Sequence, residues 1–378
     1  MKKLWIRFLV PCLFLVLSTN SVGQLFERRT IEEISFSSQV LKEKRPILIS
    51  KPTLYEGSTE RYFVVYVLDG NLNTGFTSGI AELLYQSGFP RLLVVGIPST
   101  YRDRDLTPTA YGETTSGGGA DNFLRFLKEE LIPYVDENYR THDFKVLIGH
   151  SFGGLFATHT LYTDPDIFNA YVAITPTVVY DNFYSGNKLR TFLREKNTLP
   201  TSFFFSVGNE PNLEGDAVFH LNELFKKEAP SDLNWKFEYY QKENHSTTPL
   251  IATLDGLRFT FQDLVLEDEV VKTKGLEYLK TYYANLKNKY DIPIKVPQRT
   301  LMNYGYYLME NSLNDEALDV FRLYAEMHPT IPVPYDAMAD IYIKKNNRKR
   351  AIFCLEKLLM MNPGYDYAKK RLDKLNEN

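Results

Sequence analysis

Residues 145–157 read KVLIGHSFGGLFA, and they are the most informative stretch of the chain. An apolar β-branched run leads into a glycine-rich turn around Ser151, and an apolar run typical of a helix follows. A serine on a sharp strand-to-helix turn needs small residues two positions before and after it, because the turn brings backbone against backbone. Gly149 and Gly153 meet that need, and Gly154 extends the small run. The stretch therefore predicts a nucleophilic serine whose helix supplies donors to an oxyanion.

The flanking sequence predicts an α/β domain. From residue 31 to about residue 262, β-rich runs alternate with helical periodicity, which is typical of a mostly parallel sheet with helices on both faces. Strands are expected over residues 33–37, 46–50, 62–68, 92–97, 145–148, 170–174, 202–207 and 236–240. Helices are expected over residues 122–135, 152–162, 217–227 and 250–261. With the early strands as a candidate antiparallel edge, the pattern predicts the α/β-hydrolase fold.

The elbow serine requires a histidine from elsewhere in the chain, because a hydroxyl becomes a good nucleophile only when a base accepts its proton. In this fold the order along the chain is serine, acid, histidine. Four of the six histidines are too early, adjoin the serine, or lie on the elbow helix or in the C-terminal region: His142, His150, His159 and His328. His220 falls in a helical run, where a structural role is expected. His245 lies in a polar loop between the last strand and the last helix, and it is the predicted base.

The acid is expected after the strand at residues 202–207. Glu210 is the carboxylate nearest that strand end, where it would orient the ring of His245 and stabilise its charged form. Asp216 is the alternative, although it is also placed to cap a helix that starts near Ala217.

The oxyanion hole needs two backbone N–H groups, one from the residue after the nucleophile and one from the loop after the third strand. These positions are Phe152 and Gly70, with Asn71 as the neighbour of the second donor. A plain Asp-Gly turn at residues 69–70 is the alternative interpretation.

Three segments together resemble the putative-esterase family of α/β-hydrolases, which includes enterochelin and related siderophore esterases, esterase D and feruloyl esterases. They are residues 67–71, residues 95–98 leading into 102–109, and the elbow at residues 149–154 with the late His245. The resemblance spans roughly residues 31–262. It implies that Ser151 and His245 are catalytic, and that Gly70 and Phe152 form the oxyanion hole. The family varies in its acid, and some siderophore esterases use a Ser-His pair alone, so the resemblance leaves Glu210 open.

The segment Arg102–Asp103–Arg104–Asp105 has two interpretations. Its guanidinium groups are placed to attract an anionic substrate. The favoured alternative is that both arginines pair with the two aspartates and hold the loop in shape.

The C-terminal region carries an internal repeat. Four pairs of similar residues are 34 positions apart: Leu308 and Tyr342, Ala317 and Ala351, Phe321 and Leu355, and Pro329 and Pro363. This period predicts tetratricopeptide-like helix pairs. Two repeats are too few for independent stability, so they should pack on the preceding helix or on the hydrolase domain. Their role is either to stabilise the fold or to bind a protein partner.

The first residues predict export. Lys2, Lys3 and Arg7 precede an apolar run at residues 8–17, and cleavage is expected before Gln24. The run is shorter than the roughly 20 residues that span a bilayer, so the mature chain should have no membrane span. The predicted domains are a signal peptide at 1–23, the hydrolase at 24–265, a helical connector at 266–297 and the repeats at 298–378. Once the peptide is removed, Cys354 is the remaining cysteine and has no internal disulfide partner.

Together these patterns predict a periplasmic or secreted serine esterase that hydrolyses a carboxylic ester through an acyl-enzyme on Ser151. The formal net charge of −3 argues against nucleic-acid binding. Neither zinc-type ligand spacing nor a phosphate-binding or dinucleotide motif occurs in the sequence, so neither metal nor cofactor is expected. The alternatives are a feruloyl or acetyl esterase acting on carbohydrate, an acyltransferase, and an exported non-catalytic scaffold that binds a partner through its repeats.

Overall fold

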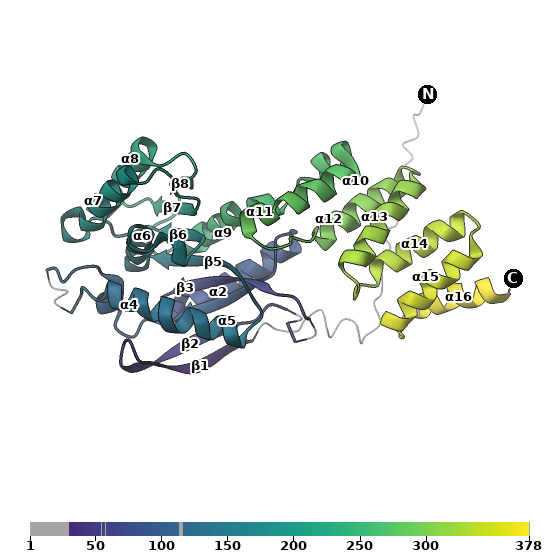
Figure 1. Cartoon of the computed structure of the whole chain (residues 1–378), viewed down its shortest axis with the longest axis horizontal. Coiled ribbons are helices and arrows are strands. Elements are labelled where there is room, and N and C mark those ends of the chain that lie inside the picture. Colours follow the sequence, from purple (N-terminus) through teal and green to yellow (C-terminus); the bar gives the residue numbers. More distant parts are fainter. Residues whose placement is uncertain (1–29, 54, 57, 113–115, 378) are drawn as a thin grey trace, which may run out of the picture. The chain divides into compact units, whose positions relative to one another are not determined.

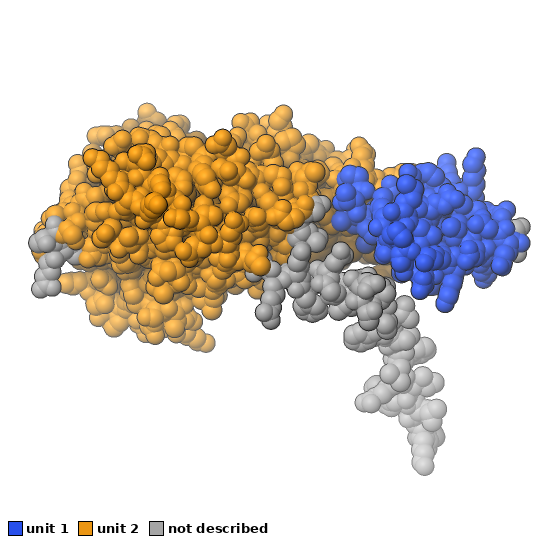
Figure 2. Space-filling model, turned by 90° about the horizontal axis from the view of Figure 1, so that it is seen from below, with its two compact units in different colours: residues 1–28, 329–378 blue, residues 29–328 orange. Residues whose placement is uncertain are grey.

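The structure is a computed structural model that describes residues 30–377 apart from residues 54, 57 and 113–115. The predicted signal peptide at residues 1–23 lies outside the described residues. Contacts divide the chain into two compact units, coloured separately in Figure 2. The larger unit comprises residues 29–328, and the smaller unit includes residues 329–378.

A single sheet dominates the described part of the larger unit. Its strands are β1 (Ile31–Ser38), β2 (Glu43–Ser50), β3 (Tyr62–Leu68), β4 (Leu92–Ile97), β5 (Thr141–His150), β6 (Ala170–Ile174), β7 (Ser202–Gly208) and β8 (Asn234–Tyr240). They lie side by side in the order β1-β2-β4-β3-β5-β6-β7-β8. All neighbours are parallel except at the edge, where β2 is antiparallel to both β1 and β4. The predicted fold class and antiparallel edge are confirmed.

Helices cover both faces of this sheet (Figure 1). On one face α2 (Gly70–Gln86) packs beside α9 (Thr248–Phe261). The other layer contains α4 (Ala120–Phe126), α5 (Ile132–Asn138), α6 (Phe152–Thr163), α7 (Tyr180–Glu195) and α8 (Leu213–Glu228). The strands β3, β4, β6 and β7 are buried along their whole length because both faces are covered.

Two predicted helices differ from the structure. The single helix expected over residues 122–135 is interrupted by a π-helical turn, Leu127–Leu131, between α4 and α5. Helix α8 begins at Leu213 rather than near Ala217, because Asn212 caps it by accepting from the N–H of Gly215 at 3.0 Å. Asp216 is therefore a first-turn residue of α8 and not its cap.

The larger unit continues beyond the sheet through α10 (Asp268–Asn285), α11 (Lys287–Tyr290), α12 (Gln298–Glu310) and α13 (Asn314–Met327). The hydroxyl of Tyr283 on α10 donates to the carbonyl of Leu264 at 2.9 Å, and Arg299 on α12 donates to the carbonyl of Gln86 at the end of α2. The first predicted repeat thus contacts the hydrolase sheet region directly. The contact division falls between residues 328 and 329, and the domain boundaries at residues 265 and 297 stay predictions.

The smaller unit contains α14 (Val333–Lys344), α15 (Arg348–Met361) and α16 (Asp366–Glu377). Arg371 on α16 holds α14 through Asp336 at 2.6 Å and Asp340 at 2.5 Å. Ala351 is fully buried near the start of α15, as Ala317 is near the start of α13. The tetratricopeptide assignment stays a prediction. None of the helices in the described part of the chain is long and apolar enough to cross a membrane.

Candidate active site

Ser151 lies at the turn between β5 and α6, where the backbone is strained. Its φ of 60° and ψ of −118° lie outside the regions that a side-chain-bearing residue normally adopts. A Cβ on Gly149 would lie 2.1 Å from the carbonyl oxygen of Gly153, so no larger residue fits there. A Cβ on Gly154 would lie 2.9 Å from the backbone of Pro176. The elbow thus needs glycine at positions 149 and 154, whereas a Cβ on Gly153 would come no closer than 3.4 Å, to Leu68.

His245 and Glu210 lie together at the carboxyl ends of the strands, the same end of the sheet as Ser151, which we call the catalytic edge. The Nδ1 atom of His245 lies 2.8 Å from Oε2 of Glu210, and Oε1 of Glu210 accepts from the hydroxyl of Thr175 at 3.1 Å. A carboxylate only accepts, so Nδ1 carries the proton and Nε2 of the neutral ring is left as an acceptor. The side chain of Glu210 is 5% exposed and that of His245 is 38% exposed. The pair therefore presents a basic nitrogen toward solvent-accessible space.

The loops that carry this pair are fastened to each other. The N–H of Asn209, after β7, donates to the carbonyl of Glu243, after β8, at 2.6 Å. Thr248 closes the loop by donating its hydroxyl to the carbonyl of Asn244 at 2.7 Å. A Cβ on Gly208 would lie 2.4 Å from Oγ1 of Thr248, so the end of β7 must be small for the loop to pack there.

The ring of His245 lies beside the elbow, against the residue that precedes Ser151. The ring of His150, next to Ser151 in the chain, lies 4.5 Å from the ring of His245, centroid to centroid. The hydroxyl of Ser151 contacts that of Thr177 at 3.2 Å. Within the described residues no hydrogen bond joins Ser151 to His245 in this conformation. Catalytic hydrogen bonds often tighten only when substrate binds, so the position of the His245 ring beside the elbow is the relevant observation.

His150 is held neutral beside the site. Burial first, and then the nearby His245 and Arg102, lower the pKa of His150 to about 4. Its Nε2 atom is buried and has no hydrogen-bond partner in the described part of the chain. Because the His150 ring is neutral, it does not repel a positive charge on the neighbouring ring of His245.

Gly70 and Phe152 are the first residues of α2 and α6. The first N–H groups of a helix have no acceptor within the helix, so both are available to an anion. A Cβ on Gly70 would lie 2.5 Å from the backbone nitrogen of Ile97, because β4 passes against the start of α2. Close packing thus requires glycine at this position.

Arg102 connects the two predicted oxyanion donors. Its Nε and Nη2 atoms contact Oδ1 and Oδ2 of Asp69 at 2.9 and 3.0 Å. The same guanidinium donates to the carbonyl of His150 at 3.3 Å and lies 5.2 Å from the ring centre of Phe152. Asp69, which precedes Gly70, has a left-handed backbone with φ 50°. One side chain therefore ties the start of α2 to the nucleophile elbow.

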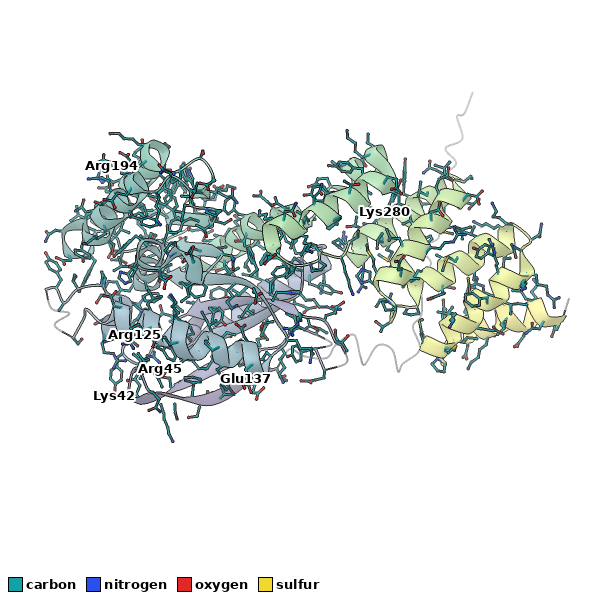
Figure 3. The ribbon with its side chains drawn as sticks, in the orientation of Figure 1. Lys42, Arg45, Arg125, Glu137, Arg194 and Lys280 are labelled. Atoms are coloured by element: carbon teal, nitrogen blue, oxygen red, sulfur yellow. The ribbon has the colours of Figure 1, made fainter. Side chains whose placement is uncertain are left out.

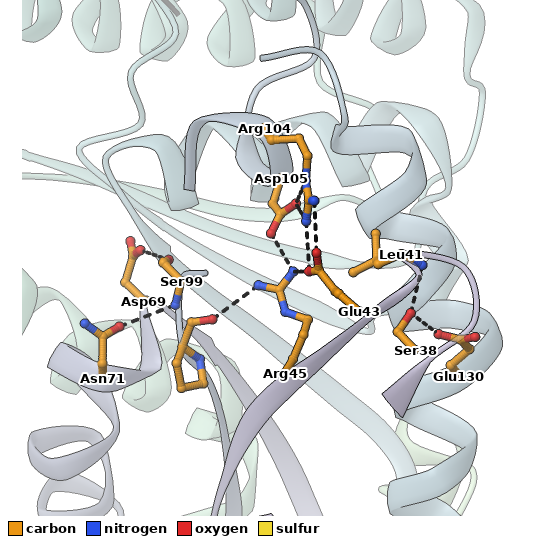
Figure 4. Close-up of polar contacts among 11 residues, drawn as sticks. Ser38, Leu41, Glu43, Arg45, Asp69, Asn71, Ser99, Arg104, Asp105 and Glu130 are labelled. Carbon is orange, nitrogen blue, oxygen red and sulfur yellow. Dashed lines mark hydrogen bonds and ion pairs between the residues drawn. The ribbon is translucent and has the colours of Figure 1, made fainter. Parts of the chain in front are cut away.

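Two contacts of the Asp69 loop are shown in Figure 4. Asp69 also accepts from the hydroxyl of Ser99, and Asn71 accepts from the N–H of Ser99 at 3.4 Å.

The short helix α3 (Arg102–Leu106) is anchored to β2 by a charged network, also drawn in Figure 4. Arg104 contacts Glu43 at 2.9 Å, and Asp105 contacts Arg45 at 2.5 Å. Arg45, which is labelled in Figures 3 and 4, is buried. It lies 5.0 Å from the ring centre of Phe123 on α4. The hydrogen bond from Arg104 lowers the pKa of Glu43, which keeps that carboxylate charged.

These contacts differ in part from the expected pairing of Arg102 and Arg104 with the aspartates of their own segment. Arg104 does pair with Asp105, at 2.7 Å, but Arg102 pairs with Asp69 instead of a neighbouring aspartate. The pairing of Arg102 with a residue 33 positions away could not be found from local charge alternation.

The other sequence candidates lie elsewhere. The side chain of Asp216 is exposed on α8, and it is Glu210 that contacts His245. His220 is exposed on the same helix. Glu210, Glu214 and His245 each offer one possible metal-ligand atom, and these atoms lie within 4.8 Å of one another. Within this group Nδ1 of His245 and Oε2 of Glu210 are already at hydrogen-bond distance from each other.

The strand order, the antiparallel second strand and the strained serine between β5 and α6 define an α/β-hydrolase. The family model described as "Putative esterase" matches residues 38–224. Over this stretch the chain matches the putative-esterase family, and it is a hydrolase acting on ester bonds.

Sequence and structure comparisons identify relatives of the same kind. Ferri-bacillibactin esterase BesA of Bacillus subtilis is 28% identical over 241 residues, which cover 56% of this chain and 83% of the relative. An IroE-like serine hydrolase from Shewanella oneidensis superposes with a TM-score of 0.70 at 27% identity, over 79% of this chain and 99% of that one. The BES protein from Bacillus cereus superposes with a TM-score of 0.54, also at 27% identity, over 61% and 94% of the two chains.

Proposed function

We propose that this protein is an exported esterase that cleaves a carboxylic ester of a siderophore through an acyl-enzyme on Ser151. The observation that carries the proposal is the contact of His245 with Glu210, at 2.8 Å, beside the ring of the residue that precedes the strained serine. A base oriented in this way next to a hydroxyl at an elbow supports nucleophilic acyl transfer.

The mechanism has two half-reactions. The hydroxyl of Ser151 turns from Thr177 toward Nε2 of His245, loses its proton to that nitrogen and attacks the ester carbonyl. The N–H groups of Gly70 and Phe152 stabilise the oxyanion, and Glu210 stabilises the charged ring. The alcohol leaves with the proton of His245. Water then attacks the acyl-serine while His245 accepts a proton, and collapse of the second tetrahedral species releases the acid and regenerates Ser151.

The substrate class is supported by relatives and by the walls of the site. The relatives include proteins named ferri-bacillibactin esterase, siderophore triacetylfusarinine C esterase and siderophore enterobactin esterase. In this chain the ring of Phe152 packs edge-on against Tyr180 at 5.5 Å, and Tyr180 packs against Tyr111 at 5.7 Å. Such an aromatic wall beside a serine favours a substrate with a planar, partly apolar acyl group. Export is supported by the composition of residues 1–23.

The test is a hydrolysis panel with the full chain and its Ser151→Ala variant. Siderophore trilactones, feruloyl sugars and simple acyl esters are offered in parallel, and a fluorophosphonate probe reports the nucleophile. We expect trilactone hydrolysis to be fastest, and Ser151→Ala to lose the label and at least 10⁴-fold in kcat. Preference for feruloyl sugars would support the carbohydrate-esterase alternative. Equal activity in both proteins would reject Ser151, and an unlabelled, folded protein without activity would support the scaffold alternative.

A further inference from the structure

A cavity lies at the amino ends of the strands, whereas Ser151 lies at their carboxyl ends. It has a volume of about 400 Å³ and is lined by the amino ends of β3 and β5, the α2–β4 loop, and residues 293–299 before and at the start of α12. Strand β3 has 7 residues, so at about 3.3 Å per residue the amino and carboxyl ends of the strands are roughly 20 Å apart. All of the lining residues belong to the larger unit.

The interior of this cavity is apolar. Its walls include Tyr62, Phe63, Phe89, Leu264 and Ile294. Of these, Tyr62 is 1% exposed and Leu264 is 3% exposed, so they offer rigid surfaces and not mobile surface side chains. A space of this size and lining matches the apolar body of a small organic molecule.

The rim of the cavity carries an excess of positive charge. Four cations line it, Arg61, Arg91, Lys295 and Arg299, against one carboxylate, that of Glu60. Arg91 lies 3.6 Å from Glu60 and also donates to the hydroxyl of Tyr85 at 2.7 Å. Glu60 can neutralise at most one of these four cations, so the rim keeps a net positive charge. This charge favours an anionic ligand.

Two buried nitrogen atoms on the wall lack a hydrogen-bond partner in the described part of the chain: Nε of Arg91 and Nδ1 of His328. Nε of arginine is always a donor. Nε2 of His328 donates to the carbonyl of Val296 at 2.8 Å, so Nδ1 accepts in the neutral ring and donates once the ring is protonated. Buried polar atoms are normally satisfied, so these two mark where a polar group of a ligand would be bound.

We propose that this cavity is a second binding site, distinct from the catalytic edge, for an organic anion with an apolar body, such as a hydrophobic carboxylate. The anionic group lies at the rim among Arg91, Lys295 and Arg299, and the apolar body lies against Phe63 and Ile294. The proposal does not depend on the role of Ser151.

The test uses two probes with the same aromatic body. 8-Anilinonaphthalene-1-sulfonate is anionic, and N-phenyl-1-naphthylamine lacks the sulfonate; both fluoresce in apolar surroundings. We expect the full chain to bind the sulfonate with 1:1 stoichiometry and at least tenfold more tightly than the neutral probe. The double change Lys295→Gln with Arg299→Gln should weaken the sulfonate about tenfold and leave the neutral probe unchanged. Lys44→Gln, an exposed lysine on β2, is the matched control and should change neither.

Two further measurements separate this cavity from the active site. Ile294→Trp should fill the cavity and remove both probes, with folding checked by urea denaturation. Modification of Ser151 by a fluorophosphonate should leave sulfonate affinity unchanged. The proposal is overturned if the blocked serine abolishes binding, if the charge changes in the folded double variant have no effect, or if Ile294→Trp folds and still binds the sulfonate as tightly as before.

Discussion

The serine half of the catalytic edge, β5 with α6, is held by backbone packing, whereas the histidine half, the loops after β7 and β8, is held by individual hydrogen bonds. At the serine half, a Cβ on Gly149 would lie 2.1 Å from the carbonyl oxygen of Gly153, so no side chain fits at position 149. At the histidine half, Glu210 contacts both Thr175 and His245. Substitutions in the first half should therefore disturb folding, while polar substitutions in the second half should alter chemistry in a folded protein.

The largest effect within this comparison is expected for Glu210→Gln. The amide keeps the size of the side chain but cannot stabilise a charged His245, so kcat should fall about 10²- to 10⁴-fold. The midpoint of urea unfolding should change little. Steady-state hydrolysis of a small ester, measured beside a urea titration, checks both.

The matched control is Asp216→Asn, in the first turn of α8, the helix that follows Glu210. Its side chain is exposed, so kcat should remain within about twofold of the unaltered protein. If Asp216→Asn is impaired and Glu210→Gln is not, the roles of the two acids are reversed. If neither is impaired, the chemistry runs on Ser151 and His245 alone.

The same contrast explains what could be predicted from the sequence. The elbow was predictable because its steric requirement is local, with glycines two residues on either side of Ser151. The choice between Glu210 and Asp216 stayed open because it depends on where α8 begins, and the capping residue Asn212 decides that. The long-range pairs, such as Arg45 with Asp105, leave no periodic signal in the sequence.

The fold shows the same limit. The strands were predictable because buried parallel strands are continuous apolar runs, as in β3 and β7. Helix α7 was not predicted, and its first turn departs from helical geometry at Asp181, Asn182 and Phe183. The start of α12 packs against α2 through Arg299, a contact that the 34-residue period does not encode.

Arg102 connects the serine half to the loop of Gly70. We expect Arg102→Lys to lower kcat about 10- to 100-fold with little change in KM, since a lysine cannot make the paired contacts to Asp69 that position the oxyanion donors. This is a positioning role. Kinetics with a neutral and an anionic ester check it.

The control for Arg102 is a double-mutant cycle with Asp69→Asn. If the two side chains act as one unit, the double variant should be no worse than the more impaired single variant. A rise in KM confined to the anionic ester, with kcat preserved, would instead assign Arg102 to substrate attraction.

The smallest effect concerns His150, which lies between the two halves and contacts His245. Its pKa of about 4 in the folded protein is below the ordinary value of 6.5, so the unfolded chain binds more protons between these two pH values. Above about pH 6.5 His150 therefore leaves the unfolding free energy unchanged, and as the pH falls toward 4 it lowers that free energy. Between pH 7 and pH 5 the unaltered protein should lose about 2 kcal/mol more unfolding free energy than His150→Asn. Urea titrations of both proteins at the two pH values measure this difference. The other buried histidines are common to both proteins, so they do not contribute to it. Equal losses in the two proteins would show that burial does not hold His150 neutral.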